Sequence, residues 1–88
     1  MKYRRSEKIL SAEVGADVVA LHIGDGQCYG MENVTAVVWA LLSEPLDLDR
    51  LCEQLVAKYD VEVARCRQEV SALLEQMQQQ GLVETVGN

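Results

Sequence analysis

The sequence predicts an α+β fold in which a three-stranded antiparallel sheet is followed by three helices. Short segments in the first third of the chain have a strand-like composition and are separated by glycines, whereas apolar residues later recur every three or four positions, as along a helix. Hydrophobic residues make up 49% of the 88 positions, which is enough to build a core and argues against disorder. A chain of this length is expected to form a single domain, residues 1–88.

The three expected strands cover residues 9–14, 17–23 and 27–31. In the second strand Val19, Leu21 and Ile23 share one face, because successive side chains of a strand point to opposite sides. Gly24-Asp25-Gly26 is expected to form the turn to the third strand, since glycine reaches positive φ without steric cost. Strands this short are not stable alone in water, so helices must pack on the sheet.

The three expected helices begin at Asn33 or Glu32, at Asp47 and at Asp60. Asn and Asp side chains favour such positions because they accept hydrogen bonds from the free N–H groups of the first turn. Pro45 lies just after the end of the first helix, near residue 42, and Gly81 ends the third in the left-handed conformation. The second and third helices follow one another with the spacing of a helix-turn-helix.

The charge distribution disfavours a nucleic-acid partner. The net charge is −6, whereas phosphate binding requires clustered Lys and Arg side chains. The second helix offers only Arg50 and Lys58, and the third only Arg65 and Arg67. A DNA-binding winged helix is therefore the less favoured alternative for this arrangement of elements.

No part of the sequence indicates a membrane segment or a secretory signal. The longest apolar run, from Val34 to Leu42, is too short to span a bilayer. Residues 1–8 are basic, but no apolar region follows them, so the expected compartment is the cytoplasm. These eight residues are expected to form a flexible, solvated arm.

The residue types needed for catalysis or metal binding do not occur in suitable patterns. Cys28, Cys52 and Cys66 are widely spaced and have no nearby His, which argues against zinc. Cys52 and Cys66 are expected to be buried, and His22 is the only histidine. There is no phosphate-binding glycine loop, no nucleophile beside a base and no paired carboxylates. We therefore expect a binding protein, with no cofactor, rather than an enzyme.

Several short motifs in order resemble the PqqD-like family. The central motif runs from Cys28-Tyr29-Gly30-Met31 through Ala36 to Val38-Trp39-Ala40-Leu41-Leu42. The resemblance continues through Leu51, Leu55, Tyr59-Asp60-Val61, Glu69-Val70, Leu73-Leu74, Met77 and Gly81-Leu82-Val83. It covers the chain from about Ile9 to Val83. The sequence departs from the family at Glu32, where the family has Asn, and at Glu69, where it has Asp.

This resemblance implies a RiPP recognition element, a winged helix-turn-helix domain that binds the leader segment of a ribosomally synthesised precursor peptide. In that family the leader adds as an extra strand to the third strand and lies against the third helix. The corresponding peptide-binding residues here are Gln27, Cys28, Tyr29, Gly30, Met31, Arg67, Val70, Leu74 and Met77. Arg67 is expected to pair with an acidic leader residue. The alternative for Val70, Leu74 and Met77 is that they are ordinary core residues.

Within the family, the chain most resembles the stand-alone subunit of lasso-peptide biosynthesis. That resemblance implies a cysteine-protease-type leader peptidase as a partner, and possibly a cyclase. It also implies that a Tyr and a Pro three residues apart in the leader dock into an apolar pocket near Tyr29 and Met77. The alternative is a PqqD-type peptide chaperone that partners a radical SAM enzyme. A homodimer through the exposed sheet edge is a further possibility.

Overall fold

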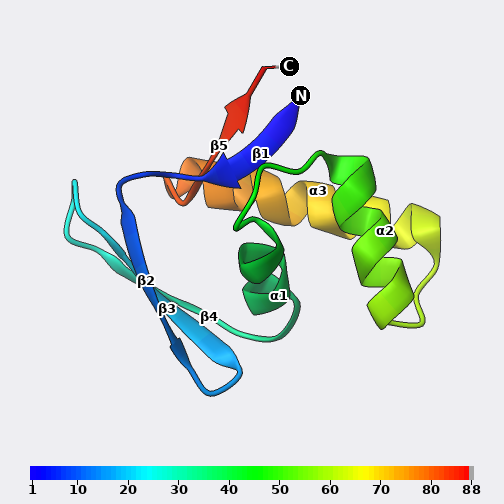
Figure 1. Cartoon of the computed structure of the whole chain (residues 1–88), viewed down its shortest axis with the longest axis horizontal. Helices are drawn as coiled ribbons and strands as arrows, with labels where there is room; N and C mark the ends of the chain where they lie inside the picture. Colours follow the sequence, from blue (N-terminus) through cyan, green and yellow to red (C-terminus); the bar gives the residue numbers. More distant parts are fainter. Residues whose placement is uncertain (88) are drawn as a thin grey trace.

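The computed structural model describes residues 1–87 and confirms the predicted α+β architecture. The elements are β1 (Lys2–Arg5), β2 (Ile9–Val14), β3 (Asp17–His22), β4 (Cys28–Met31), α1 (Asn33–Leu41), α2 (Leu48–Lys58), α3 (Val63–Gln79) and β5 (Val83–Val86). The three helices lie to one side of the β2–β3–β4 sheet, and the paired strands β1 and β5 lie above α3 (Figure 1).

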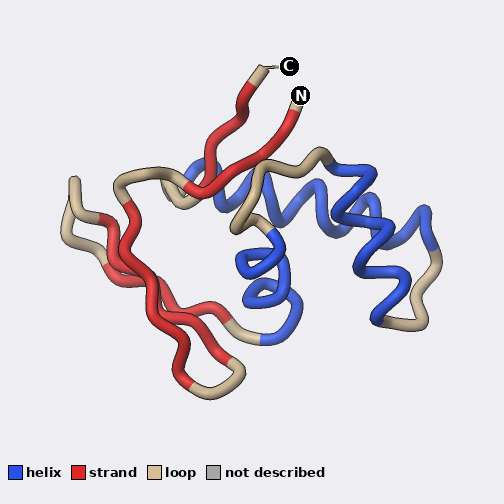
Figure 2. Tube along the Cα trace, in the orientation of Figure 1, coloured by secondary structure: helices blue, strands red, loops and turns tan. Residues whose placement is uncertain are grey.

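The central sheet has the strand order β2-β3-β4, and both of its pairings are antiparallel (Figure 2). The register places Ala20 opposite Tyr29 and Val18 opposite Met31, so these four side chains share one face. Val18, Ala20 and Met31 on this face are buried, which shows that it is the face turned toward the helices. The opposite face is exposed.

Residues 2–5, expected to belong to a flexible arm, instead form β1, and that expectation is wrong for them. β1 pairs with β5 in antiparallel register, and Arg4 forms an ion pair with Glu84 at 2.8 Å. On its other side, Tyr3 exchanges two backbone hydrogen bonds with Leu46. The basic start of the chain is therefore held between the C-terminal strand and the α1–α2 connection.

Arg5 and Trp39 connect β1 to α1. The Arg5 Nε and Nη2 atoms donate to the carbonyl oxygen of Trp39 at 2.9 and 2.6 Å, and its guanidinium carbon lies 4.7 Å from the centre of the Trp39 ring. The Trp39 indole nitrogen donates to the Ser11 hydroxyl at 3.2 Å. The buried Trp39 thus links α1 to both β1 and β2, because its ring and its carbonyl are used together.

The start of α2 agrees with the sequence-based prediction, whereas the start of α3 does not. Asp47 caps α2 as predicted, because its carboxylate accepts from the Arg50 backbone N–H at 2.8 Å. Glu32 holds the cap position of α1 without a side-chain hydrogen bond. The predicted start of α3 at Asp60 is wrong: the helix begins at Val63, because the chain stays extended through its N-cap residue Glu62.

The C-terminal end of α3 agrees with the prediction. Gly81 has φ 76° and donates its N–H to the Gln78 carbonyl, while the Leu82 N–H reaches back to Met77 at 2.9 Å. These two bonds form a Schellman motif, which satisfies carbonyls that would otherwise be left free at a helix end. The motif turns the chain so that Leu82 and Val83 re-enter the core, as expected.

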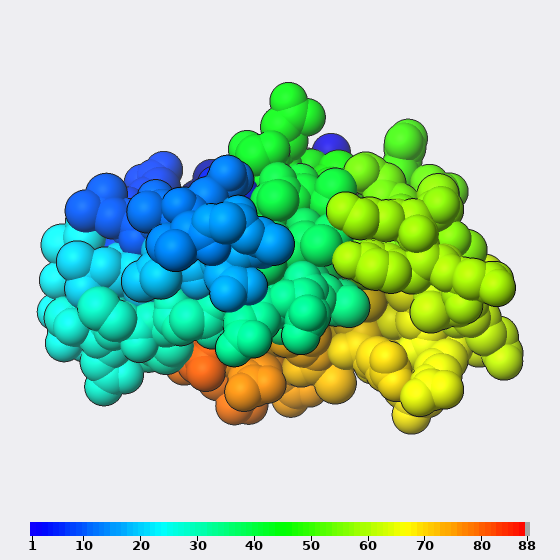
Figure 3. Space-filling model, turned by 90° about the horizontal axis from the view of Figure 1, so that it is seen from below, coloured from blue at the N-terminus to red at the C-terminus, as the bar shows by residue number. Residues whose placement is uncertain are grey.

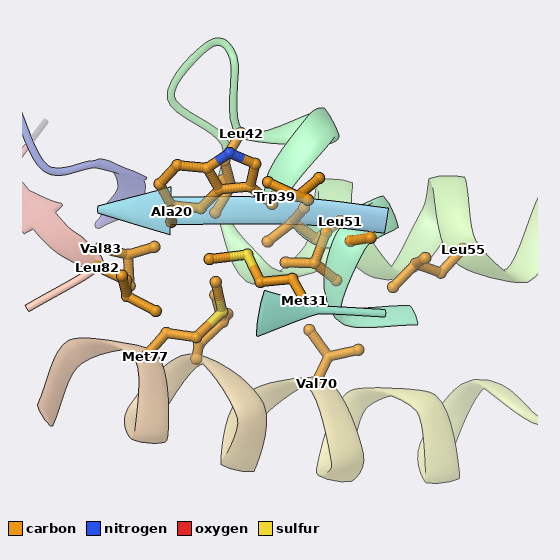
Figure 4. Packing of buried hydrophobic residues seen from close by; sticks show 14 of the residues in the cluster. Ala20, Met31, Trp39, Leu42, Leu51, Leu55, Val70, Met77, Leu82 and Val83 are labelled. Atoms are coloured by element: carbon orange, nitrogen blue, oxygen red, sulfur yellow. The ribbon is translucent and has the colours of Figure 1, made fainter. Parts of the chain in front are cut away.

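The core lies between the sheet and the helices. Its largest fully buried side chains are Met31, Val38, Leu42, Leu51, Leu55, Leu74, Met77 and Leu82. Figure 4 shows Val70 and Met77 rising from α3 toward Met31 of β4, with Leu82 and Val83 beside Met77. Within residues 1–87, no helix combines the length and the apolar character required to cross a bilayer.

Candidate functional site

The outer edge of β4 has no strand beside it among residues 1–87. The His22 N–H donates to the Gln27 carbonyl at 2.9 Å, and such bonded pairs alternate with non-bonded pairs along an antiparallel ladder. Tyr29 and Met31 therefore direct their backbone groups toward β3, whereas Cys28 and Gly30 direct theirs away from the sheet. Both of these residues are exposed. The edge consequently offers unpaired N–H and C=O groups to an extended chain.

The side chains of this edge alternate between two environments. Met31 is buried and Tyr29 is half-buried on the inner face, and the Tyr29 hydroxyl donates to the Gln27 side-chain oxygen at 3.0 Å. Cys28 lies on the outer face with Gly30. Four of the five predicted edge residues therefore form β4, and Gln27 lies directly before it. The core uses only the inner side chains of this strand, above all Met31.

The predicted α3 residues divide into two groups. Val70, Leu74 and Met77 are at most 3% exposed and belong to the core. They support β4 from below, as Figure 4 shows for Val70 and Met77. Arg67 is exposed and pairs with the Asp49 carboxylate of α2, which raises the pKa of its guanidinium. Its role as a peptide contact stays a prediction.

A cavity of about 630 Å³ lies between the start of α1, the end of α2 and the first half of α3. Its lining residues are Val34, Leu55, Tyr59, Asp60, Val61, Glu62, Arg65, Cys66, Glu69, Val70 and Leu73. Val34 and Val61 remain 41% and 43% exposed, so the cavity has an apolar mouth. Arg65 and Glu69 form an exposed ion pair at 3.0 Å on its α3 side.

This cavity opens three residues beyond the end of β4, since Met31 ends the strand and Val34 lines the cavity. Neither Tyr29 nor Met77 is among its lining residues, so it lies apart from the pocket position that the sequence suggests. Sequence reasoning missed Val34, Tyr59 and Leu73. Val61 could have been recognised as a candidate contact residue from the sequence, because it is apolar and lies outside the helical stripes. The fold leaves this side chain at the surface.

The Cys52 thiol is a poor nucleophile at neutral pH, because its pKa is raised. Cys66 lines the cavity from below, and Cys52 of α2 is buried beside it. Burial, reinforced by the Cys66 thiol, raises the pKa of Cys52 to about 11. Across residues 1–87, no three His, Cys, Asp or Glu side chains are grouped to hold a metal ion. The free β4 edge and the cavity beyond it provide backbone hydrogen-bonding groups and apolar surface that suit an extended chain with an apolar side chain.

The fold of this chain is similar to the folds of two proteins of known structure. The fold is similar to a solved structure of TbiB1 in complex with the TbiA(beta) leader peptide, with a TM-score of 0.89, 24% identity, and coverage of 97% of this chain and 99% of that one. It is also similar to lasso peptide synthetase B1 complexed with the leader peptide, with a TM-score of 0.82, 17% identity, and coverage of 97% and 100%.

No curated protein matches the sequence. The model of one family, described as coenzyme PQQ synthesis protein D (PqqD), matches residues 17–83. The matched region begins with β3 and ends at the start of β5, so it includes the free edge, all three helices and the cavity. This chain therefore belongs to the PqqD family, as its motifs indicate.

Proposed function

We propose that this protein is a RiPP recognition element, which binds the leader segment of a ribosomally synthesised precursor peptide. The proposal rests on the free edge of β4, which leads into an apolar cavity against α3. Both similar solved structures are complexes with leader peptides, which supports the same class of ligand here. Binding rather than catalysis is the proposed role.

The leader adds to β4 as a fourth strand. The outward backbone groups of Cys28 and Gly30 exchange hydrogen bonds with it, and these bonds provide affinity that does not depend on leader side chains. Alternate leader side chains point inward beside Tyr29 or outward along the exposed face. An apolar leader side chain beyond the strand enters the cavity at Val34, where burial provides sequence selectivity.

The proposed pathway is lasso-peptide maturation. The B1 subunit found among the similar structures supports this choice. In this role the protein delivers the leader to a cysteine-protease-type leader peptidase, and possibly to a cyclase. The family description, coenzyme PQQ synthesis, favours a second candidate, in which the same peptide-binding edge serves a radical SAM enzyme as a peptide chaperone.

Titration with the leader peptide tests the binding mode. Backbone amide shifts in NMR spectra should concentrate on residues 27–31 and on the cavity side of α3, because these groups change their hydrogen-bonding or packing partners. Shifts confined to the middle of α2, with β4 unchanged, would contradict strand addition.

Two valines provide a matched test of the cavity. Val61 lines the cavity and Val63 does not, although both are exposed and they lie two residues apart. Val61→Gln should weaken leader binding roughly tenfold, the equivalent of about 1.4 kcal/mol of lost apolar burial. Val63→Gln should leave the affinity within twofold. Equal effects of the two variants, measured by calorimetry, would remove the cavity from the binding site.

A further inference from the structure

Cys52 of α2 and Cys66 of α3 are the two thiols of the core. The two helices pack against each other, and Figure 3 shows them in contact at one end of the molecule, coloured yellow-green and yellow. Both side chains are almost fully buried, with exposures of 4% and 6%, and both are free thiols. The two thiols are hydrogen-bonded to each other. The core therefore holds two sulfur atoms in contact across a helix–helix interface.

This contact is compatible with the geometry of a disulfide. The axes of packed helices lie about 8–10 Å apart, and each Cα atom lies about 2.3 Å from its axis. Residues that face each other directly therefore have Cα atoms roughly 3.5–5.5 Å apart, a range that overlaps the 4.4–6.8 Å typical of disulfides, to an order of magnitude. Since the two sulfur atoms are already neighbours, side-chain rotation and a slight approach of the helices are enough to join them.

The two thiols differ in their access to solvent. Cys66 lines the cavity that we assign to the leader, whereas Cys52 does not. A small oxidant that enters the cavity therefore meets the Cys66 sulfur first. Cys52 lies behind it, where burial raises its pKa to about 11 and keeps it as a neutral thiol. The pair thus consists of a thiol that can be reached and a second thiol that touches it.

We propose that Cys52 and Cys66 form a reversible disulfide when a hydroperoxide enters the cavity, and that this bond weakens leader binding. This inference rests on the proposed function and adds a redox control to the same site. Oxidation of two neighbouring thiols within one chain requires no partner protein. Small thiols can reverse it by thiol–disulfide exchange.

The oxidation takes place in two steps. In the first, the Cys66 sulfur attacks one oxygen of the hydroperoxide and the O–O bond breaks. The products are a Cys66 sulfenic acid and a molecule of water or alcohol, which carries away the thiol proton. In the second, the Cys52 sulfur attacks the Cys66 sulfur, the S–O bond breaks, and the hydroxide leaves with the Cys52 proton as water. The two thiols together lose two electrons, which reduce the O–O bond.

The contact between the two sulfur atoms compensates for the weak nucleophilicity of Cys52. A reaction between groups that are already held together avoids the entropic cost of an encounter. The same contact limits further oxidation of Cys66, because the sulfenic acid condenses with the thiol beside it. We therefore expect the disulfide to be the main product.

The disulfide affects the cavity because it joins two of the helices that form the cavity walls. Leu55 and Tyr59 line the cavity from the end of α2, and Cys66 and Val70 line it from α3. Drawing the Cys66 sulfur toward Cys52 brings these walls together and holds them there. An apolar leader side chain then has less space, and closely packed walls do not easily adapt to it.

Leader binding and oxidation are therefore linked. A leader side chain in the cavity covers Cys66 and favours the reduced pair. If the disulfide weakens leader binding tenfold, saturating leader must disfavour the disulfide by the same factor. For a two-electron couple, that factor raises the reduction potential of the pair by about 30 mV.

The test uses the full chain carrying Cys28→Ser, in which Cys52 and Cys66 are the only cysteines. Treatment with hydrogen peroxide should remove the mass of two hydrogen atoms. Trypsin without reductant should then release residues 51–58 joined to residues 66–67. Calorimetry with the leader peptide of the precursor should show binding at least tenfold weaker in the oxidised protein than in the same protein before treatment. Dithiothreitol should restore the original affinity.

A matched control adds Cys66→Ala to the same protein. Its remaining thiol, Cys52, neither lines the cavity nor has a second thiol to join. Peroxide treatment of this control should therefore leave its leader affinity within twofold of the untreated value. The comparison also accounts for oxidation of methionine side chains, which are the same in both proteins.

The outcomes that would contradict the inference differ from one another. If the joined peptides do not form while the reduced protein binds the leader, the inference fails and the proposed function stands. If they form but leader affinity does not change, the disulfide does not control the site. An equal loss of affinity in the control would assign the effect to another oxidised residue. If the reduced protein does not bind the leader, the proposed function fails, and redox control of leader binding fails with it.

Discussion

At Gly81, both the backbone conformation and the neighbouring atoms disfavour any residue that has a Cβ. Its φ of 76° is unfavourable for other residues, and a Cβ there would lie 3.0 Å from the His22 ring. That ring cannot move away freely, because its Nδ1 atom accepts from the backbone N–H groups of Gly24 and Asp25 at 3.1 and 3.3 Å. The turn between α3 and β5 therefore depends on glycine.

Gly81→Ala should lower the free energy of unfolding by roughly 2–3 kcal/mol, since backbone strain and the contact with His22 add. Gly15→Ala is the matched control, because Gly15 has a similar φ of 65° with no heavy atom near its absent Cβ. It should cost only about 1 kcal/mol. In a His22→Ala background the two alanine substitutions should cost the same in urea unfolding, and a persistent difference would exclude the ring as its cause.

Arg65 and Arg67 of α3 distinguish two possible peptide contacts: Arg67 is the contact predicted from the sequence, and Arg65 lines the cavity. Each forms an ion pair, Arg65 with Glu69 and Arg67 with Asp49, but only Arg65 and Glu69 line the cavity. For a leader with an acidic residue near the cavity, Arg65→Gln should weaken binding several-fold while Arg67→Gln should not. Affinities from fluorescence anisotropy decide between them. If only Arg67→Gln weakens binding, the result supports Arg67 as the peptide contact, as predicted from the sequence.

At the scale of elements, α2 and α3 meet through a pair of buried thiols. The pKa of Cys52 is about 11 when folded, because burial and the Cys66 thiol disfavour its thiolate, whereas an unfolded thiol has a pKa of about 8.5. Folding thus favours the neutral thiol. Its stabilising contribution is complete below about pH 8.5 and is lost as the pH rises toward 11.

The unfolding free energy of the wild type should therefore fall relative to that of Cys52→Ala between about pH 8.5 and 10.5. The difference between the two proteins should change by roughly 2 kcal/mol over this range. Urea unfolding at several pH values measures it, and taking the difference cancels the titration of lysines and tyrosines. Val63→Ala, which removes an exposed side chain without a titrating group, should show no such trend. If the difference in unfolding free energy between the wild type and Cys52→Ala does not change with pH, the folded protein does not raise the pKa of Cys52.

Elements with local signals could be predicted from the sequence, and elements made by distant pairing could not. Strand-like composition ending at Gly15 identified β2, the two-faced pattern of residues 17–23 identified β3, and the Asp47 cap identified the start of α2, because each of these signals lies within a few residues. β1 is polar and basic, and its partner β5 lies about 80 residues away. No local pattern can report such a pairing, so a solvated arm was the natural expectation.

At the scale of the whole molecule, the same distinction holds for the candidate site. The β4 edge could be predicted because an end strand of a sheet needs only the strand order. The cavity could not, since Val34, Tyr59 and Leu73 come from three separate helical regions and meet only after packing. Val70, Leu74 and Met77 have the spacing of either a groove or a core, and only the structure shows that all three are buried while Val70 also lines the cavity.

The pairing of β1 with β5 also makes this chain an insertable module. Lys2 and Val86 face each other in the register, so the outer ends of β1 and β5 lie about 5 Å apart, on the side away from the β2–β3 turn (Figure 1). A host protein can accommodate such a chain within a single loop without separating the loop's two ends. The β2–β3–β4 sheet lies away from these residues (Figure 1), so an insertion at this point would leave the free β4 edge uncovered by the host.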